Sequence, residues 1–298
     1  MGIFVHILSS SVEMKKAIVI GSGPAGISAA LYLKRINIDV MVISKGIGAL
    51  EKAEKIENFY GTEALSGTEL YERGIESAKK LGIEFIKEQA VSIDFDENFK
   101  PVIETEKNSY KADAVLLAMG VSRKSQNIKG LKEFEGKGVS YCAVCDAFFY
   151  RNRDVAVLGN GEYALHEASV LAQTSKSVTI LSNGLDMETE LPENIKYINK
   201  KIISVNGENT VQSVTFDDSE VFETSGIFVA LGIAGSVDLA RKIGIEVADN
   251  KIIVNENMQT NIPSIFAAGD CIGGLLQVSK AVSDGARAGL AMINFLKN

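Results

Sequence analysis

The sequence predicts an α/β protein built from two Rossmann-like domains, the second inserted into the first. Residues 17–44 and 155–182 share one pattern, in which a buried apolar strand leads through a glycine turn into an amphipathic helix and then a second apolar strand. Strand-like sequence returns at 265–270, and a helix pattern follows over 277–296. Because this tail resumes the first domain, the second repeated unit is an insertion.

The first glycine turn, G-S-G-P-A-G at residues 21–26, has the spacing of a dinucleotide-binding loop. Gly21 allows the tight turn out of the strand, Gly23 lets the backbone approach a pyrophosphate, and Gly26 lets the helix pack on the strand. The following helix N-terminus presents free N–H groups to phosphates. Each unit is therefore expected to be a three-layer (ββα) dinucleotide-binding domain.

Shorter patterned segments lie between and after the repeated units. Residues 113–120 read as a strand of the first domain, and residues 202–232 alternate like a small antiparallel sheet that ends in a strand at 227–231. The expected division of the chain is a leader or misassigned start at 1–13, the first part of the first domain at 14–123, the inserted domain at 124–233 and the second part of the first domain at 234–298.

The composition is that of an ordinary globular protein, since 46% of the 298 residues are hydrophobic and 23% are charged. The net charge of −7 argues against nucleic acid as a partner, because phosphate binding needs a basic surface. No apolar run approaches the roughly 20 residues that span a bilayer, so no membrane association is expected. Three cysteines are too few for a secreted disulfide scaffold, and a cytoplasmic protein is expected.

Two of the three cysteines, Cys142 and Cys145, stand three positions apart in C-A-V-C-D. A zinc site needs about four ligands. Beyond this pair, the chain has only Cys271, His6 and His166 as further cysteines or histidines. No metal site is therefore expected. Two merely structural thiols remain an alternative for the pair.

A redox role fits the chemistry of the cysteine motif better. One thiol of a C-x-x-C pair can be held as a thiolate at neutral pH, especially where a helix starts. Exchange runs through a mixed disulfide, so one cysteine attacks the substrate and the other resolves the intermediate. Asp146 follows the pair directly and is placed to shuttle a proton, although a helix N-cap is an alternative role for it.

With these features, the chain from residue 14 to its C-terminus resembles the low-molecular-weight thioredoxin reductases. The matching motifs are I-E-N-F-Y-G at 56–61, K-G-V-S-Y-C-A-V-C-D-A-F-F-Y-R at 137–151 and A-A-G-D at 267–270. The resemblance implies an FAD enzyme that passes electrons from a donor through FAD and the cysteine pair to the disulfide of thioredoxin or a similar protein. It also implies a homodimer, and an inserted domain that rotates to present the pair to the flavin or to the substrate.

The resemblance also assigns roles to single residues. Cys145 would face the flavin ring, Cys142 would attack the disulfide of thioredoxin, and Asp146 would be the acid. The FAD pyrophosphate would be held by Gly21, Ser22, Gly23, Pro24, Ala25 and Gly26. The residues lining the flavin and its ribityl chain would be Asn58, Gly269, Asp270, Gln277 and Val278, and Ser44 stands at the ribose position of the FAD unit.

The second unit departs from the family where NADPH would bind. The family's pattern after the second strand is H-R-R-x-x-x-R, whose arginines hold the 2′-phosphate, whereas residues 182–188 read S-N-G-L-D-M-E. No arginine stands between Arg153 and Arg241, and Asp186 and Glu188 would repel a phosphate. NADP recognition needs an arginine nearby, so NADPH is not the expected donor.

NADH is not favoured either, because Ser182 stands where its ribose would need an acid. The glycine turn is also altered, since Glu162 brings negative charge and Tyr163 brings bulk to the expected phosphate position. Some similar flavoenzymes that lack these motifs take electrons from reduced ferredoxin, and ferredoxin is the expected donor here, with NADPH or NADH as the alternative. Residues 123–154 carry seven basic and four acidic residues, which suits an acidic protein partner or simply a solvated surface.

Three other functions fit parts of the sequence. A dithiol oxidase that passes electrons through FAD to oxygen would also lack the NADPH motif. A ferredoxin–NADP reductase of the same architecture would not need the cysteine pair, and a non-catalytic flavoprotein would leave it inert. Cys271 directly follows A-A-G-D and is interpreted as a packing cysteine.

Overall fold

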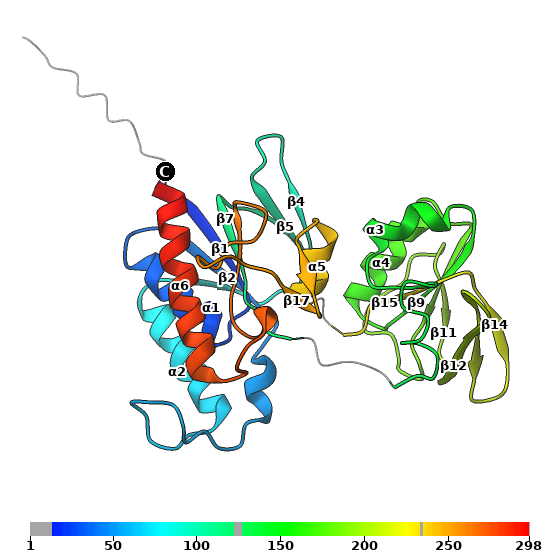
Figure 1. The fold of residues 1–298 in the computed structure, drawn as a ribbon, viewed down its shortest axis with the longest axis horizontal. Coiled ribbons are helices and arrows are strands. Elements are labelled where there is room, and N and C mark those ends of the chain that lie inside the picture. Colours follow the sequence, from blue (N-terminus) through cyan, green and yellow to red (C-terminus); the bar gives the residue numbers. More distant parts are fainter. Residues whose placement is uncertain (1–13, 122–126, 233–234, 298) are drawn as a thin grey trace, which may run out of the picture.

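The computed structural model describes residues 14–121, 127–232 and 235–297. These residues form two lobes, each built around its own parallel sheet (Figure 1). The predicted leader at 1–13 and the predicted domain changes after residues 123 and 233 lie outside the described residues, so these boundaries stay predictions.

The first lobe contains a five-stranded parallel sheet in the order β18-β7-β1-β2-β3. Its strands are β1 (Lys16–Ile20), β2 (Asp39–Ile43), β3 (Glu84–Ile86), β7 (Ala114–Leu117) and β18 (Ile265–Ala267). Strand β18 pairs with β7, placing Ile265 opposite Val115. The tail thus completes the sheet that the first residues begin, which confirms the predicted insertion.

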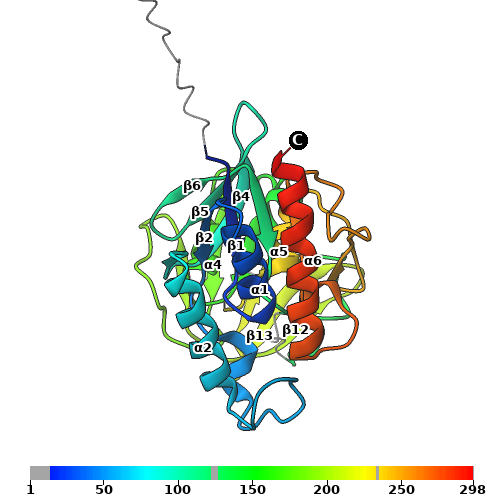
Figure 2. The same cartoon turned by 90° about the vertical axis from the view of Figure 1, so that its left-hand side faces the viewer.

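Two further layers cover this sheet. The helices α1 (Pro24–Lys34) and α6 (Val278–Lys297) pack against each other on one face, together with α2 (Gly67–Lys80) (Figure 2). The other face carries an antiparallel sheet of β4 (Ala90–Phe95), β5 (Pro101–Thr105) and β6 (Ser109–Lys111).

Alternation along β1 shows why both faces are covered. Ala17 and Val19 lie in the core shared with α1 and α6, whereas Ile18 and Ile20 lie in the core shared with β4 and β5. All four side chains are at most 1% exposed. A strand buried on both faces reads as an unbroken apolar run, which is the pattern that predicted it.

The second lobe repeats this architecture around a parallel sheet of order β11-β10-β9-β15-β8. Its strands are β8 (Val139–Ser140), β9 (Asp154–Leu158), β10 (Ser177–Leu181), β11 (Lys196–Ile198) and β15 (Ile227–Val229). The covering elements are the helices α3 (Ala143–Asp146) and α4 (Glu162–Ala172), and the antiparallel strands β12 (Ile202–Gly207), β13 (Val211–Phe216) and β14 (Val221–Glu223). The predicted α/β class with two dinucleotide-binding units is confirmed.

Two expected strands differ in the structure. The strand predicted at 227–231 was expected to end the antiparallel sheet, but β15 joins the parallel sheet between β9 and β8. The strand predicted at 265–270 ends at Ala267, because the chain turns at Gly269 (φ 86°) into the 3-10 helix η3 (Asp270–Ile272). Pairing with strands far away in the sequence places β15 in the parallel sheet, and the positive φ of Gly269 marks the turn after β18.

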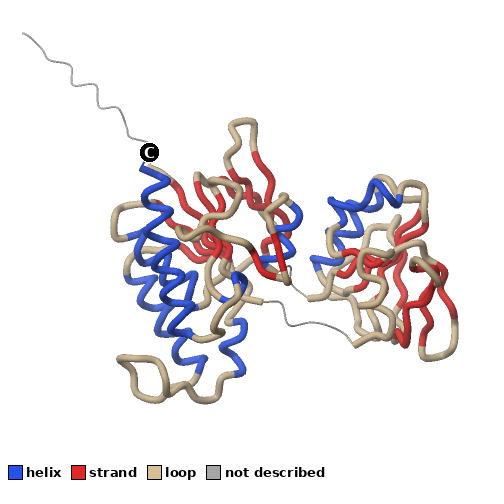
Figure 3. The backbone as a smooth tube through the Cα atoms, viewed as in Figure 1, coloured by secondary structure: helices blue, strands red, loops and turns tan. Residues whose placement is uncertain are grey.

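The helix α5 (Ser236–Lys242) follows the return from the second lobe and packs on β4 of the first. It lies where the first lobe faces the second, as the tube view shows (Figure 3). The hairpin of β16 (Val247–Ala248) and β17 (Lys251–Ile252) supports it, and the remaining 3-10 helices are η1 (Gly48–Lys52) and η2 (Ala147–Tyr150). Among the described residues, no helix combines the length and apolar character needed to cross a membrane.

Candidate active site

The glycine turn between β1 and α1 leaves room for a bound anion. Gly21 has φ 114°, and a Cβ at Gly26 would lie 1.9 Å from the carbonyl oxygen of Gly21, so both positions require glycine. A Cβ at Gly23 would meet no atom within 4 Å. Pro24 begins α1, whose first turn has no side-chain cap. Free N–H groups and open space therefore coincide, which fits the pyrophosphate of FAD.

Three hydroxyl groups gather beside this turn. The Oγ of Ser22 lies 2.7 Å from the Oγ of Ser44 and 3.0 Å from the hydroxyl of Tyr71 in α2. Ser44 also donates to the carbonyl oxygen of Gly46 at 3.1 Å. The structure thus brings predicted residues Ser22 and Ser44 together at the carboxyl ends of β1 and β2, where a ribose is bound in this fold.

The predicted flavin-lining residues fall into two groups around the start of α6. Asn58 donates its side-chain N–H to Oε1 of Gln277 at 2.9 Å, and Val278 begins α6. A Cβ at Gly269 would lie 3.0 Å from the Cβ of Ala25, so A-A-G-D meets the first glycine turn directly. Asp270 begins η3 at the same corner.

An ion pair on α6, which the sequence did not reveal, holds Gly269 in place. Lys280 lies 2.7 Å from Asp284, one turn further along α6, and donates to the carbonyl oxygen of Gly269 at 2.9 Å. Asp284 in turn accepts the N–H of Gly269 at 3.3 Å. Lys280 and Asp284 are four positions apart in the sequence, but many surface ion pairs on helices have the same spacing, so it did not single out this pair.

The cysteine pair forms a disulfide at the start of α3. Cys142 is the N-cap of this short helix, and its Sγ accepts the backbone N–H of Cys145 at 3.2 Å. Cys142 is only 4% exposed, whereas Cys145 is exposed. In this arrangement the cysteine predicted to attack the substrate is therefore the shielded one.

Asp146 reaches the cysteine segment through Ser140. Its carboxylate accepts the hydroxyl of Ser140 at 2.7 Å, and that hydroxyl accepts the backbone N–H of Cys142 at 3.1 Å. Asp146 stands at the N-cap position of η2, but its side chain makes no cap bond there, and Cys142 caps α3. The hydrogen-bond chain instead suits proton transfer near the pair.

A hollow of about 410 Å³ lies beside the disulfide. The residues that line it come from both lobes and are Gly136, Val139, Ser140, Tyr141, Cys142, Cys145, Asp146, Arg241, Ile245 and Val247. Outside it, Val144, Phe148 and Phe149 leave 55%, 75% and 68% of their surfaces exposed. The disulfide therefore borders an interlobe hollow, and Val144, Phe148 and Phe149 form an exposed apolar rim on α3 and η2.

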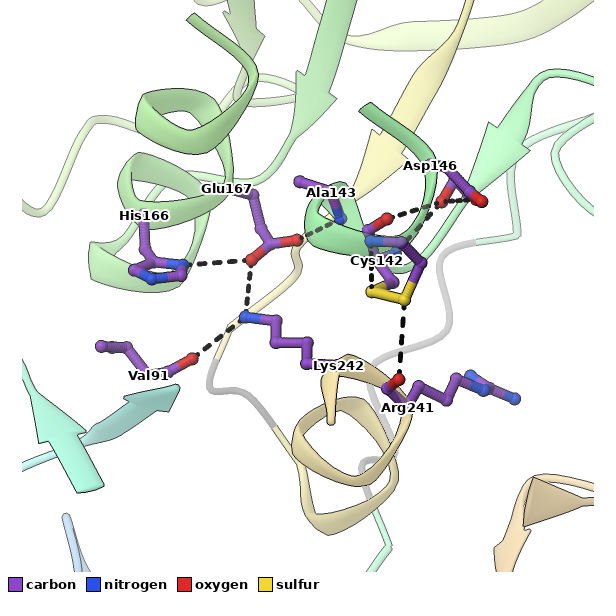
Figure 4. Close-up of a disulfide and its surroundings, with 10 residues drawn as sticks. Val91, Cys142, Ala143, Asp146, His166, Glu167, Arg241 and Lys242 are labelled. Carbon is purple, nitrogen blue, oxygen red and sulfur yellow. Dashed lines mark hydrogen bonds and ion pairs between the residues drawn. A yellow bond between two sulfur atoms is a disulfide. The ribbon is translucent and has the colours of Figure 1, made fainter. Parts of the chain in front are cut away.

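The last turn of α5 contacts the disulfide from the opposite lobe (Figure 4). The carbonyl oxygen of Arg241 lies 3.5 Å from Sγ of Cys145. The guanidinium group of Arg241 stands 5.8 Å from the centre of the Tyr141 ring. Burial, together with a hydrogen bond to Glu135, raises the pKa of Tyr141 far above its usual range.

The glycine turn of the second lobe is filled where that of the first is open. A Cβ at Gly161 would lie 3.1 Å from a carboxylate oxygen of Glu188. Asn160 holds this segment in place, because its carbonyl accepts the N–H of Glu188 at 2.8 Å and its side chain donates to the carbonyl of Asp186 at 3.0 Å. Ser182 bonds to Asn199 at 3.0 Å inside its own lobe.

Cys271 and the described histidine, His166, have hydrogen-bond partners other than the disulfide. Cys271 is a free thiol with no exposed surface, and burial raises its pKa to about 11. His166 contacts Glu167 at 3.1 Å, and His6 lies outside the described residues. Among the residues that the structure describes, no three His, Cys, Asp or Glu side chains gather closely enough to hold a metal ion.

The sequence did not identify five residues at the site. They are Tyr71, Lys280, Asp284, and the buried pair of Glu167 and Lys242, which is described below. Each lies on a helix, where its spacing resembles that of ordinary surface charges. Only the folded arrangement brings them to the site.

A model of the pyridine nucleotide-disulphide oxidoreductase family matches residues 15–285. Thioredoxin reductases of Aquifex aeolicus and Bacillus subtilis are each 32% identical to the chain. The first alignment covers 98% of this chain and 96% of the relative, and the second covers 97% and 96%.

Solved structures are similar over nearly the whole chain. The atypical thioredoxin reductase of Desulfovibrio vulgaris Hildenborough is 35% identical, with a TM-score of 0.89 over 95% of this chain and 98% of that one. A ferredoxin-flavin thioredoxin reductase from Clostridium acetobutylicum is 31% identical, with a TM-score of 0.71 over 96% and 100%. The Lactococcus lactis thioredoxin reductase in its FR conformation is 31% identical, with a TM-score of 0.56 over 95% and 99%.

Proposed function

This chain belongs to the pyridine nucleotide-disulphide oxidoreductase family and is a flavin disulfide oxidoreductase with FAD as its cofactor, and we propose that it reduces the disulfide of thioredoxin or a similar protein. The observation that carries the proposal is the Cys142–Cys145 disulfide, which stands beside an exposed apolar rim. Exposed apolar groups of this kind commonly mark a protein-binding surface.

The cofactor is proposed to lie along the carboxyl ends of β1 and β2. Its pyrophosphate would meet the turn of Gly21, Ser22, Gly23, Pro24, Ala25 and Gly26, and Ser44 would hold the ribose. Its flavin end would meet Asn58, Gly269, Asp270, Gln277 and Val278. When bound, FAD supplies the two-electron chemistry that the side chains lack.

The protein's own residues then carry out disulfide exchange. Two electrons and two protons convert the Cys142–Cys145 disulfide into two thiols. Cys142 loses its proton, which we assign to Asp146, and attacks the substrate disulfide as a thiolate. The attack forms a mixed disulfide and releases one substrate thiolate, which takes that proton back from Asp146. Cys145 then attacks Cys142, which restores the enzyme disulfide and releases the reduced substrate.

We further propose reduced ferredoxin as the electron donor. Glu188 stands over Gly161 at the start of α4, where a nucleotide pyrophosphate would need open space. Its carboxylate would repel phosphate, and no arginine occurs between Arg153 and Arg241 to offset that repulsion. The similarity to a ferredoxin-flavin thioredoxin reductase supports the same choice. A homodimer and a cytoplasmic location stay predictions.

Trapping the mixed disulfide tests the catalytic assignment. Cys145→Ser removes the resolving thiol, so the purified holoenzyme should form a stable adduct with oxidised thioredoxin through Cys142. Non-reducing electrophoresis and mass spectrometry of the linked peptides measure the adduct. Cys142→Ser is the matched control and should form at most a tenth as much. A larger adduct yield with Cys142→Ser would reverse the two roles, and no adduct with either variant would contradict the proposed substrate.

A further inference from the structure

A buried ion pair joins the two lobes next to the disulfide (Figure 4). Lys242, the last residue of α5 in the first lobe, lies 2.6 Å from Glu167 of α4 in the second. The two side chains are 2% and 1% exposed. Charges this deeply buried are tolerated only when they are paired and their remaining hydrogen-bonding capacity is filled.

Each charge is anchored in its own lobe. Lys242 donates to the carbonyl oxygen of Val91 at 3.0 Å, and β4, which contains Val91, belongs to the first lobe. Glu167 contacts His166 at 3.1 Å and accepts the backbone N–H of Ala143 at 2.8 Å, both in the second lobe. Burial opposes ionisation of Glu167, but the contacts with His166 and Lys242 outweigh it and lower its pKa.

The pair is directly connected to the cysteine segment. Ala143 follows Cys142 in the chain, so the carboxylate of Glu167 holds the start of α3. The residue before Lys242, Arg241, places its carbonyl oxygen 3.5 Å from Sγ of Cys145. The last turn of α5 therefore contacts the cysteine segment in two ways. The carbonyl oxygen of Arg241 contacts Cys145, and the charged group of Lys242 pairs with Glu167, which holds the start of α3.

We propose that Glu167 and Lys242 form a latch between the lobes that holds the disulfide against α5 and must open before a protein substrate reaches Cys142. This inference rests on the proposed function, because only a protein-sized substrate requires such opening. A protein interface buries about 800 Å² on each partner, and Cys142 is 4% exposed in the latched arrangement. Both latch residues are thus positioning residues.

Loss of one latch residue should shift the lobes toward open arrangements. Lys242→Met leaves the carboxylate of Glu167 without its buried partner, which destabilises the latched state. Glu167→Gln removes the charge but keeps an oxygen that can accept the N–H of Ala143. Both changes should raise the ratio of open to latched molecules at least tenfold. Because the two residues act as one pair, the double variant should add little to either change.

Small-angle X-ray scattering of the oxidised, FAD-loaded enzyme tests the latch without any substrate. Wild-type scattering should fit the latched arrangement, and both single variants should depart from it. Lys176→Met is the matched control, because it removes an exposed ion pair with Asp154 inside the second lobe. FAD content and the melting temperature identify any variant that fails to fold, and Glu167→Gln is the milder change. Wild-type-like scattering by both folded variants would overturn the latch.

A second measurement tests whether opening limits substrate access. Enzyme reduced with dithionite is mixed with oxidised thioredoxin in a single turnover, so the natural donor plays no part. A larger open population should lower the half-saturating thioredoxin concentration at least threefold, with less effect on the limiting rate. An unchanged concentration in variants that scatter as open would overturn the requirement for opening. If wild-type enzyme reduces no thioredoxin at all, the proposed function fails, while the scattering still decides whether the latch exists.

Discussion

Single glycines define the FAD turn more sharply than any side chain does. Gly26 has no room for a Cβ, because the carbonyl oxygen of Gly21 would lie 1.9 Å away. Gly21 needs its positive φ of 114°. Both requirements come from the backbone, which explains why the G-x-G-x-x-G pattern could be recognised from the sequence alone.

Gly26→Ala should therefore release the cofactor. The added methyl group pushes α1 away from the turn, and purified protein should hold less than a tenth of the wild-type FAD, measured from flavin absorbance per chain. Gly74→Ala is the matched control. Gly74 lies inside α2, and the nearest atom to a Cβ there would belong to the side chain of Ile27, at an ordinary contact distance of 3.7 Å. It should keep its FAD and be slightly more stable, by about 0.5–1 kcal/mol. Full FAD content in Gly26→Ala would contradict this packing.

The strand–turn–helix unit occurs twice in this chain, and its two copies differ at the glycine turn. In the first lobe the space beside Gly23 is open, and in the second Glu188 stands over Gly161. The sequence predicted both units, and it identified the missing arginines. It did not predict that the segment at 182–188 folds back over the turn, because that depends on the bonds of Asn160 to Glu188 and Asp186.

Gly161→Ala tests whether the filled turn of the second lobe binds a ligand during catalysis. A Cβ at Gly161 would meet the movable end of Glu188 at 3.1 Å, and the carbonyl oxygen of Gly232 only at 3.9 Å, so turnover of thioredoxin with photoreduced ferredoxin should stay within twofold of wild type. Gly159→Ala is the contrasting variant, since its Cβ would lie 2.1 Å from the carbonyl oxygen of Ala230 and should destabilise the lobe. More than a tenfold loss in a well-folded Gly161→Ala enzyme would indicate that a ligand needs this glycine.

The two phenylalanines that η2 contributes to the apolar rim lead to a prediction about substrate size. Phe148→Ser with Phe149→Ser removes the exposed aromatic surface beside the disulfide. The half-saturating concentration of thioredoxin should rise about tenfold, which corresponds to about 1.4 kcal/mol of binding free energy. Reduction of a small disulfide by the dithionite-reduced enzyme should not change. Phe99→Ser is the control, because Phe99 is 84% exposed in the first lobe, outside the rim. An equal loss with Phe99→Ser would contradict a specific rim.

At the scale of the whole molecule, the sequence predicted what local patterns encode. The two units, the insertion and the cysteine pair all follow from short motifs or from apolar runs. Contacts between the lobes could not be predicted in this way. Glu167 and Lys242 are 75 positions apart in numbering, and nothing in their local sequence distinguishes them from solvated charges. The low exposure of Cys142, at 4%, was not predicted from the sequence either.

The proposed function requires FAD and the cysteine pair to work in this chain without a pyridine nucleotide. Anaerobic flavin absorbance of the purified enzyme tests it most directly, with NADPH, NADH and photoreduced ferredoxin added separately, each with and without thioredoxin. Ferredoxin should bleach the flavin, and thioredoxin should restore its colour, whereas millimolar nucleotide should leave the spectrum unchanged. Rapid bleaching by NADPH or NADH would contradict the proposed donor and would indicate that the nucleotide binds at the second glycine turn.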